Sequence, residues 1–97
     1  MSEQPGTYSV PGRVEIRPEC FLVYDDDRYQ APTPEEVREA LRRVSLTGAA
    51  AGRVLGVSGR AIRRWTGGES DIPYSAWRLL LLETGQAQLE FRKVADG

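Results

Sequence analysis

The sequence predicts a mainly helical fold of four to five short helices, preceded by a short extended or β-like N-terminal arm. Three observations support this prediction. Apolar residues recur at helical spacing after residue 33, threonine and serine stand at the expected N-caps, and glycine or proline separates each helical stretch from the next. The 97 residues suffice for one domain. We expect a partly flexible arm over residues 1–32 and a helical domain over residues 33–97.

The arm is predicted to contain short strands or extended segments. Residues 1–12 are rich in Pro, Gly and polar residues, which is typical of a flexible segment. Residues 13–17 alternate between polar and apolar side chains, and residues 20–24 are rich in residues that favour strands. Pro18 separates these two stretches, and the run of three aspartates at 25–27 indicates a turn.

The first helix begins at a complete N-terminal signal. Thr33 can cap it, Pro34 suits the first helical position, and Glu36 stands where a capping box requires it. Apolar residues then follow at helical spacing, namely Val37, Ala40, Leu41 and Val44.

Three further helices follow, over residues 48–55, about 59–66 and 74 to about 84. Thr47 is the N-cap of the second helix, and Gly56 supplies its left-handed stop. Ser58 caps the third helix, and Pro73 opens the fourth. Residues 86–97 are weakly compatible with a fifth helix.

Positive charge is concentrated in one part of a chain whose overall net charge is −1. Residues 33–68 hold seven arginines against three glutamates, whereas residues 1–32 hold three arginines against six acidic residues. Residues 53–64 contain four arginines and no acidic residue. Such a patch is typical of a surface that meets a polyanion.

The third predicted helix separates an apolar face from an arginine face. Ile62 and Trp65, three residues apart, are expected to face the core. Arg60, Arg63 and Arg64 lie at i, i+3 and i+4, so they share the outer face. A short helix of this kind suits the negatively charged major groove of DNA.

The stretch from about residue 34 to 85 resembles the helix-turn-helix of the phage-repressor and Cro type, the XRE-like DNA-binding family. The matching residues are Leu46-Thr47, Ala51-Gly52, Gly56-Val57-Ser58, Ile62, Trp65, Gly67-Gly68 and Pro73. The chain departs from the family pattern at two places. Gly48 stands where the family usually has Gln, a frequent phosphate contact, and Thr66-Gly67-Gly68 replaces the usual Glu-Asn-Gly turn.

The resemblance implies a sequence-specific, DNA-binding transcriptional regulator, most often a repressor that covers a promoter. Its expected partners are double-stranded DNA with an inverted-repeat operator and a second copy of the chain. Thr47, Gly48 and Arg53 are the expected phosphate contacts, with the amides of the helix start. The residues expected to meet base edges and nearby phosphates are Ser58, Gly59, Arg60, Arg63 and Arg64.

Enzymatic and metal chemistry find no support in the composition. The chain has no histidine and a single cysteine, Cys20, which we expect to be a small buried residue. We therefore expect no enzyme, no metal and no cofactor. No apolar run reaches the length of a membrane span and no secretory signal is visible, which favours the cytoplasm. The resemblance implies that this is a bacterial or phage-host cytoplasm, in association with the nucleoid.

Three alternatives remain open at this point. The apolar run Trp77, Leu79, Leu80, Leu81 and Leu82 could fill the core or, with Leu89 and Phe91, form a dimer seam. The aspartates at 25–27 are expected to form a solvated turn, but they could also hold a cation or cover the arginines. The acidic arm keeps a second function open, that of a protein–protein partner module such as an antitoxin or a mobile-element assembly subunit.

Overall fold

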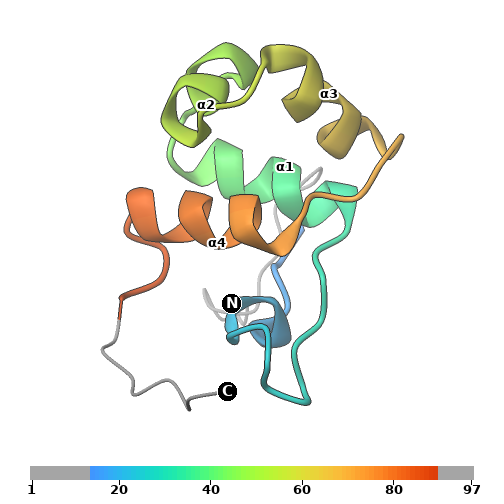
Figure 1. Ribbon diagram of the computed structural model, residues 1–97, viewed down its shortest axis with the longest axis vertical. Coiled ribbons are helices and arrows are strands. Elements are labelled where there is room, and N and C mark those ends of the chain that lie inside the picture. The colour runs from blue at the N-terminus through green and yellow to red at the C-terminus, as the bar shows by residue number, and fades with distance from the viewer. Residues whose placement is uncertain (1–13, 90–97) are drawn as a thin grey trace, which may run out of the picture.

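Four α-helices follow a short 3₁₀-helix in the computed structural model, which describes residues 14–89 (Figure 1). The 3₁₀-helix η1 spans Pro18–Phe21, and the α-helices span Pro34–Arg43 (α1), Gly48–Leu55 (α2), Gly59–Gly67 (α3) and Tyr74–Glu83 (α4). Figure 1 shows α2 and α3 at one end of the molecule, α1 and α4 across its middle, and η1 at the other end. The predicted mainly helical fold class is confirmed.

The helices begin and end where local chemistry predicts. Thr33 Oγ1 accepts the backbone N–H of Glu36 at 3.1 Å, and the Glu36 carboxylate accepts the backbone N–H of Thr33 at 2.8 Å, which completes the capping box of α1. Thr47 and Ser58 cap α2 and α3, and each accepts the N–H of the third residue after it at 3.1 Å. Gly56 follows α2 with a φ of +74°, a left-handed conformation that costs glycine little.

The core draws on all four α-helices and on the N-terminal segment. Trp77, Leu80 and Leu81 of α4 are at most 1% exposed. The other buried hydrophobic residues are Ile16, Cys20, Val37, Ala40, Leu41, Ala51, Ile62, Trp65 and Ile72. Core packing therefore accounts for most of the apolar run on α4, whereas Leu79 of that run stays 36% exposed.

The prediction of short strands in the arm is wrong for the residues that the structure describes. Residues 14–17 belong to no strand, although Arg17 has an extended backbone, residues 18–21 form η1, and no strand occurs elsewhere between residues 14 and 89. Pro18 favours the 3₁₀-helix because its ring fixes φ at the first helical position. The backbone groups of this segment bond to side chains of α1 and α4 instead of to a neighbouring strand.

The chain ends are covered only in part by the described residues. Residues 86–89 are not helical, so the weakly predicted fifth helix does not begin there. The rest of that prediction, and the flexibility expected for residues 1–12, lie outside the described residues. The division between an arm and a helical domain after residue 32 stays a prediction.

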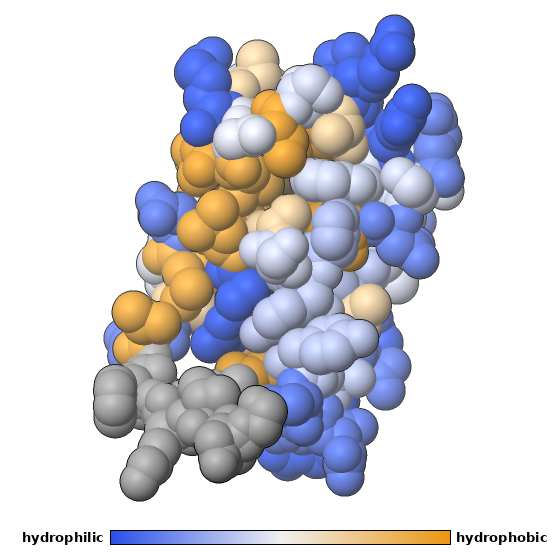
Figure 2. Space-filling view, in the orientation of Figure 1, coloured by the Kyte–Doolittle hydropathy of each residue, from blue (hydrophilic) through white to orange (hydrophobic). Residues whose placement is uncertain are grey.

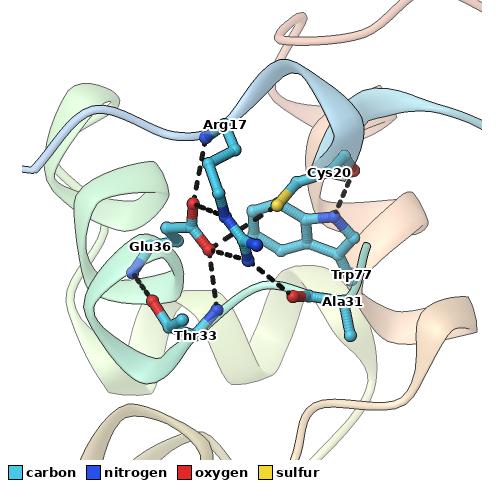
Figure 3. A network of polar contacts seen from close by, with 6 residues as sticks. All are labelled: Arg17, Cys20, Ala31, Thr33, Glu36 and Trp77. Carbon is cyan, nitrogen blue, oxygen red and sulfur yellow. Dashed lines mark hydrogen bonds and ion pairs between the residues drawn. The ribbon is translucent and has the colours of Figure 1, made fainter. Parts of the chain in front are cut away.

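A buried carboxylate fastens the N-terminal segment to α1 (Figure 3). Glu36 is 2% exposed and accepts hydrogen bonds from the Arg17 guanidinium at 2.8 Å on both oxygens and from the Arg17 backbone N–H at 2.9 Å. Burial alone would raise the pKa of Glu36, but the bonds from Arg17 and from the Thr33 N–H hold it at about 2. Trp77 extends this connection to α4 by donating its Nε1–H to the carbonyl oxygen of Cys20 at 2.8 Å.

Cys20 is the small buried residue that the sequence predicts. It is 1% exposed, and burial raises the pKa of its thiol to about 11, so the thiol is neutral at physiological pH. The rings of Tyr24, Tyr29 and Tyr74 lie close together in space, with centroids 5.2 to 5.8 Å apart. These rings join the turn after η1 to the start of α4.

Candidate nucleic-acid interface

A tight turn holds α2 and α3 close together. The backbone N–H of Val57 donates to the carbonyl oxygen of Gly52 at 2.9 Å, next to the left-handed Gly56. Gly52 is buried, and a Cβ placed on it would lie 2.6 Å from the carbonyl oxygen of Val57. Only glycine fits at this position without a shift of the backbone.

The two faces of α3 are arranged as the sequence predicts. Ile62 and Trp65 are 3% and 9% exposed and belong to the core. Arg60, Arg63 and Arg64 are all exposed on the opposite side. Their guanidinium groups are therefore accessible to a large ligand such as a DNA duplex.

The remaining predicted site residues lie on or next to the same two helices. Thr47 and Ser58 are exposed N-caps whose side-chain oxygens each accept a helix N–H. Gly48 and Gly59 are the partly exposed first residues of α2 and α3. Arg53 is exposed in the second half of α2.

The arginines of α2 and α3 differ in electrostatic environment from those of α1. Each arginine of α1 has a carboxylate within 3.7 Å: Arg38 pairs with Glu35, and Arg42 and Arg43 share Glu39. By contrast, none of the four arginines on α2 and α3 forms an ion pair within residues 14–89, and residues 47–68 contain no acidic residue. The α2–α3 surface therefore carries four uncompensated positive charges, Arg53, Arg60, Arg63 and Arg64.

The acidic turn lies away from these arginines. Figure 1 places the chain that follows η1 at the end of the molecule opposite α2 and α3. Asp26 pairs there with Arg28 at 3.0 Å, and this bond lowers the pKa of Asp26.

No described group of three or more His, Cys, Asp or Glu residues could hold a metal ion. Within the described chain, no helix is long and apolar enough to cross a membrane.

An open groove beside α3 adds residues that the sequence interpretation missed. It has a volume of about 400 Å³ and separates Arg38 and Arg42 on α1 from Gly48 and Arg63. Arg38 and Arg42 lie at i and i+4 and so share one face of α1, which is the signal that could have identified them. The position of that face relative to α3 is a property of the tertiary structure.

Hydropathy divides the surface into two sides. Figure 2 shows hydrophilic side chains gathered on the side of α3, and apolar side chains along the opposite edge, over α2 and the C-terminal half of α4. Val54 on α2 is 38% exposed, and Leu79 on α4 is 36% exposed. Leu89, after α4, is 82% exposed. The apolar edge and the arginine face are therefore separate parts of the surface.

Comparison with known proteins identifies relatives. The chain is 48% identical over 68 residues to a transcriptional repressor protein KorC of Escherichia coli, a match that covers 67% of this chain and 78% of the relative. A second KorC repressor of Escherichia coli is 44% identical over 70 residues, which cover 69% of this chain and 80% of the relative. No family model and no solved structure matches the chain. At these identities and coverages, the chain belongs to the family of the KorC transcriptional repressors.

Proposed function

We propose that this protein is a DNA-binding transcriptional repressor that occupies promoter DNA through a helix-turn-helix of the phage-repressor and Cro type. The observation that carries this proposal is the set of four arginines on α2 and α3 that have no ion-pair partner within the described residues. Unpaired cations of this kind bind DNA by neutralising phosphates and releasing their counterions. Membership in a family of repressors supports the same function. The protein would act in the cytoplasm and need no cofactor.

In this proposal α3 enters the major groove and α2 lies over the adjacent backbone. Arg53, the Thr47 hydroxyl and the first amides of α2 at Gly48 contact phosphates, because the first turn of a helix leaves its N–H groups without intrahelical partners. The residues facing base edges and nearby phosphates are Ser58, Gly59, Arg60, Arg63 and Arg64. Arg60, one residue after the start of α3, is the proposed reader of guanine through the O6 and N7 acceptors.

A salt titration tests this proposal. Affinity for duplex DNA should fall steeply between about 50 and 200 mM salt, with a slope of about −0.9 per phosphate contact in a plot of log K against log salt concentration. Arg53→Gln should reduce the magnitude of this slope by about 0.9, the value for one phosphate contact, on every DNA sequence. The control is Arg28→Gln, because Arg28 pairs with Asp26 at the other end of the molecule. Affinity that does not depend on salt would overturn the proposal and favour the partner-module alternative.

Base recognition by Arg60 needs a separate experiment. Arg60→Ala should relax the preference for one guanine per half-site, at a cost of about 1–3 kcal/mol on the cognate site and much less on random DNA. The measurement is a binding selection against a randomised half-site. If Arg60→Ala weakens every sequence equally, Arg60 is a phosphate contact and not a reader.

We further propose that two copies pair through the apolar edge and bind an inverted-repeat operator. Val54, Leu79 and Leu89 supply the exposed apolar surface that this pairing would cover. A two-fold axis would place the two α3 helices one DNA turn apart, about 34 Å, so the half-site centres would be about 10 bp apart. Leu79→Glu should shift the protein toward the monomer in sedimentation, whereas Val14→Glu should not, although both residues are 36% exposed. A wild-type monomer at tens of micromolar that binds one asymmetric site would contradict the dimer.

A further inference from the structure

We infer that the groove between α1 and α3 is a second DNA contact, which holds the sugar–phosphate backbone alongside the major groove that α3 enters. This inference rests on the proposed function and adds α1 to the surface that meets DNA, with Arg42 as a phosphate contact and Arg38 as a residue that positions the groove. The groove belongs to the same face as the proposed recognition residues, because Arg63 lines the groove and is also one of the exposed arginines of α3.

The lining of the groove matches the chemistry of a sugar–phosphate strand. Its floor contains the apolar residues Leu41, Leu46 and Ile62, while Arg38, Arg42 and Arg63 contribute guanidinium groups. A nucleic-acid strand alternates apolar deoxyribose carbons with anionic phosphates, so it can present both kinds of surface to such a lining. An open groove with a cationic rim suits a strand that passes across it better than a small molecule, which needs to be enclosed.

Gly48 leaves room for the strand to approach. A Cβ at this position would lie 3.7 Å from Cγ2 of Ile62, so a side chain here would begin directly beside the apolar floor. Glycine keeps this side of the groove open and places the first turn of α2 next to it. Backbone amides and the arginines across the groove thereby take over the phosphate contact that Gln usually makes at this position in the resembled family.

Two arginines of α1 share one carboxylate, so these three side chains together retain net positive charge beside the groove. Glu39 accepts hydrogen bonds from Arg42 at 2.6 and 2.9 Å and from Arg43 at 3.0 Å, so one carboxylate faces two guanidinium groups. These bonds lower the pKa of Glu39 to about 2, which keeps it ionised at physiological pH. The Arg42 side chain remains 43% exposed and can bond a phosphate while it stays close to Glu39.

Arg38 and Arg63 have different roles in this contact. Arg38 donates to the carbonyl oxygen of Thr66 near the end of α3 and pairs with Glu35 at 3.7 Å, so it fixes α3 against α1 and keeps the groove in shape. Arg63 has no ion-pair partner within the described chain, and a Cβ placed on Gly59 would lie 3.5 Å from one of its Nη atoms. Because Arg63 also lines the groove, it contacts a phosphate at the groove edge in this arrangement, which leaves Arg60 and Arg64 for the bases.

Two neighbouring arginines provide a matched test. Arg42→Gln and Arg43→Gln each remove one partner of Glu39, and the two side chains are similarly exposed, at 43% and 39%, but only Arg42 lines the groove. For the full chain on a random duplex, Arg42→Gln should reduce the salt slope by about 0.9, the value for one phosphate contact. Arg43→Gln should leave the slope unchanged. Equal slopes for the two variants would overturn the inference.

A second variant tests the groove without altering a charge. Gly48→Leu places a side chain over the apolar floor and favours the helix by propensity, so it should keep the protein folded while it weakens DNA binding several-fold. Unchanged affinity in a folded Gly48→Leu protein would contradict the inference. The two hypotheses fail separately. Loss of the groove contact leaves steep, Arg53-dependent salt sensitivity in the wild type, whereas failure of the proposed function removes that sensitivity altogether.

Discussion

Replacing Gly52 by alanine has two opposite effects on stability. Alanine has the higher helix propensity, but its Cβ would be too close to the turn between α2 and α3. Within a helix, alanine is normally more stable than glycine by about 0.5–1 kcal/mol. At Gly52, however, the added Cβ would lie 2.6 Å from the carbonyl oxygen of Val57 and 3.4 Å from backbone atoms of Ser58 and Gly59. These neighbours are backbone atoms of the turn, so they cannot move aside by a change of rotamer. The turn and α3 must shift together.

The expected cost follows from this contact. Overpacking of a close-packed site costs about 1–3 kcal/mol. In a domain of this size each kcal/mol lowers the melting temperature by about 4–8 °C, so Gly52→Ala should melt roughly 4–24 °C below the wild type. Circular dichroism during thermal and urea unfolding measures the difference.

A second glycine supplies the control. Gly67 is the last residue of α3 and is exposed, and a Cβ placed on it would meet nothing within 4 Å. Gly67→Ala should therefore show the ordinary propensity gain of up to about 1 kcal/mol. If Gly52→Ala is stabilised as much as Gly67→Ala, then α2 does not approach the turn as closely as described and the reasoning fails.

Two further predictions concern the core and the N-terminal segment. Trp65→Ala should cost roughly 3–5 kcal/mol and could unfold the domain, because Trp65 is 9% exposed within the core. A stable Trp65→Ala protein that had lost only its DNA affinity, in urea unfolding and binding assays, would show that Trp65 serves the interface instead. The pKa of Glu36 is about 2 in the folded protein, against an ordinary value of 4.5, and this difference corresponds to a contribution to folding stability on the order of 3 kcal/mol. The contribution is fully present above about pH 4.5 and is lost as the pH falls toward 2. Glu36→Gln should lower stability at pH 7 and flatten the loss of stability between pH 5 and pH 2 in urea titrations; an unchanged acid profile would contradict the role of the Arg17–Glu36 contact.

Local chemistry made most of the helical fold predictable from the sequence. Thr33, Thr47 and Ser58 cap their helices within three residues of themselves, and Gly56 ends α2 by its own backbone freedom. None of these features depends on a distant part of the chain. The orientation of α3 was predictable for a related reason, since the 3.6-residue period alone separates apolar residues from arginines.

The N-terminal segment could not be predicted because its structure depends on distant residues. Arg17 and Glu36 are 19 positions apart, and Trp77 bonds to Cys20 across 57 positions. Strand-favouring residues at 20–24 pointed to a different structure, and β propensity depends strongly on such a context. The groove beside α3 was missed for the same reason, because the spacing of Arg38 and Arg42 on α1 does not reveal which helix lies opposite.

The net charge of −1 is a poor guide to what this chain binds, and the structure supplies the reason. The glutamates of α1 are engaged by arginines of α1 and by Arg17, so they do not compensate α2 or α3. The acidic turn lies at the opposite end of the molecule (Figure 1). At physiological ionic strength the Debye length is about 8 Å, so exposed charges further away than that are largely screened. A phosphate close to α3 would therefore interact mainly with the arginines of α2 and α3, which form no ion pair within residues 14–89. A chain that is acidic as a whole can thus still present a cationic face to DNA.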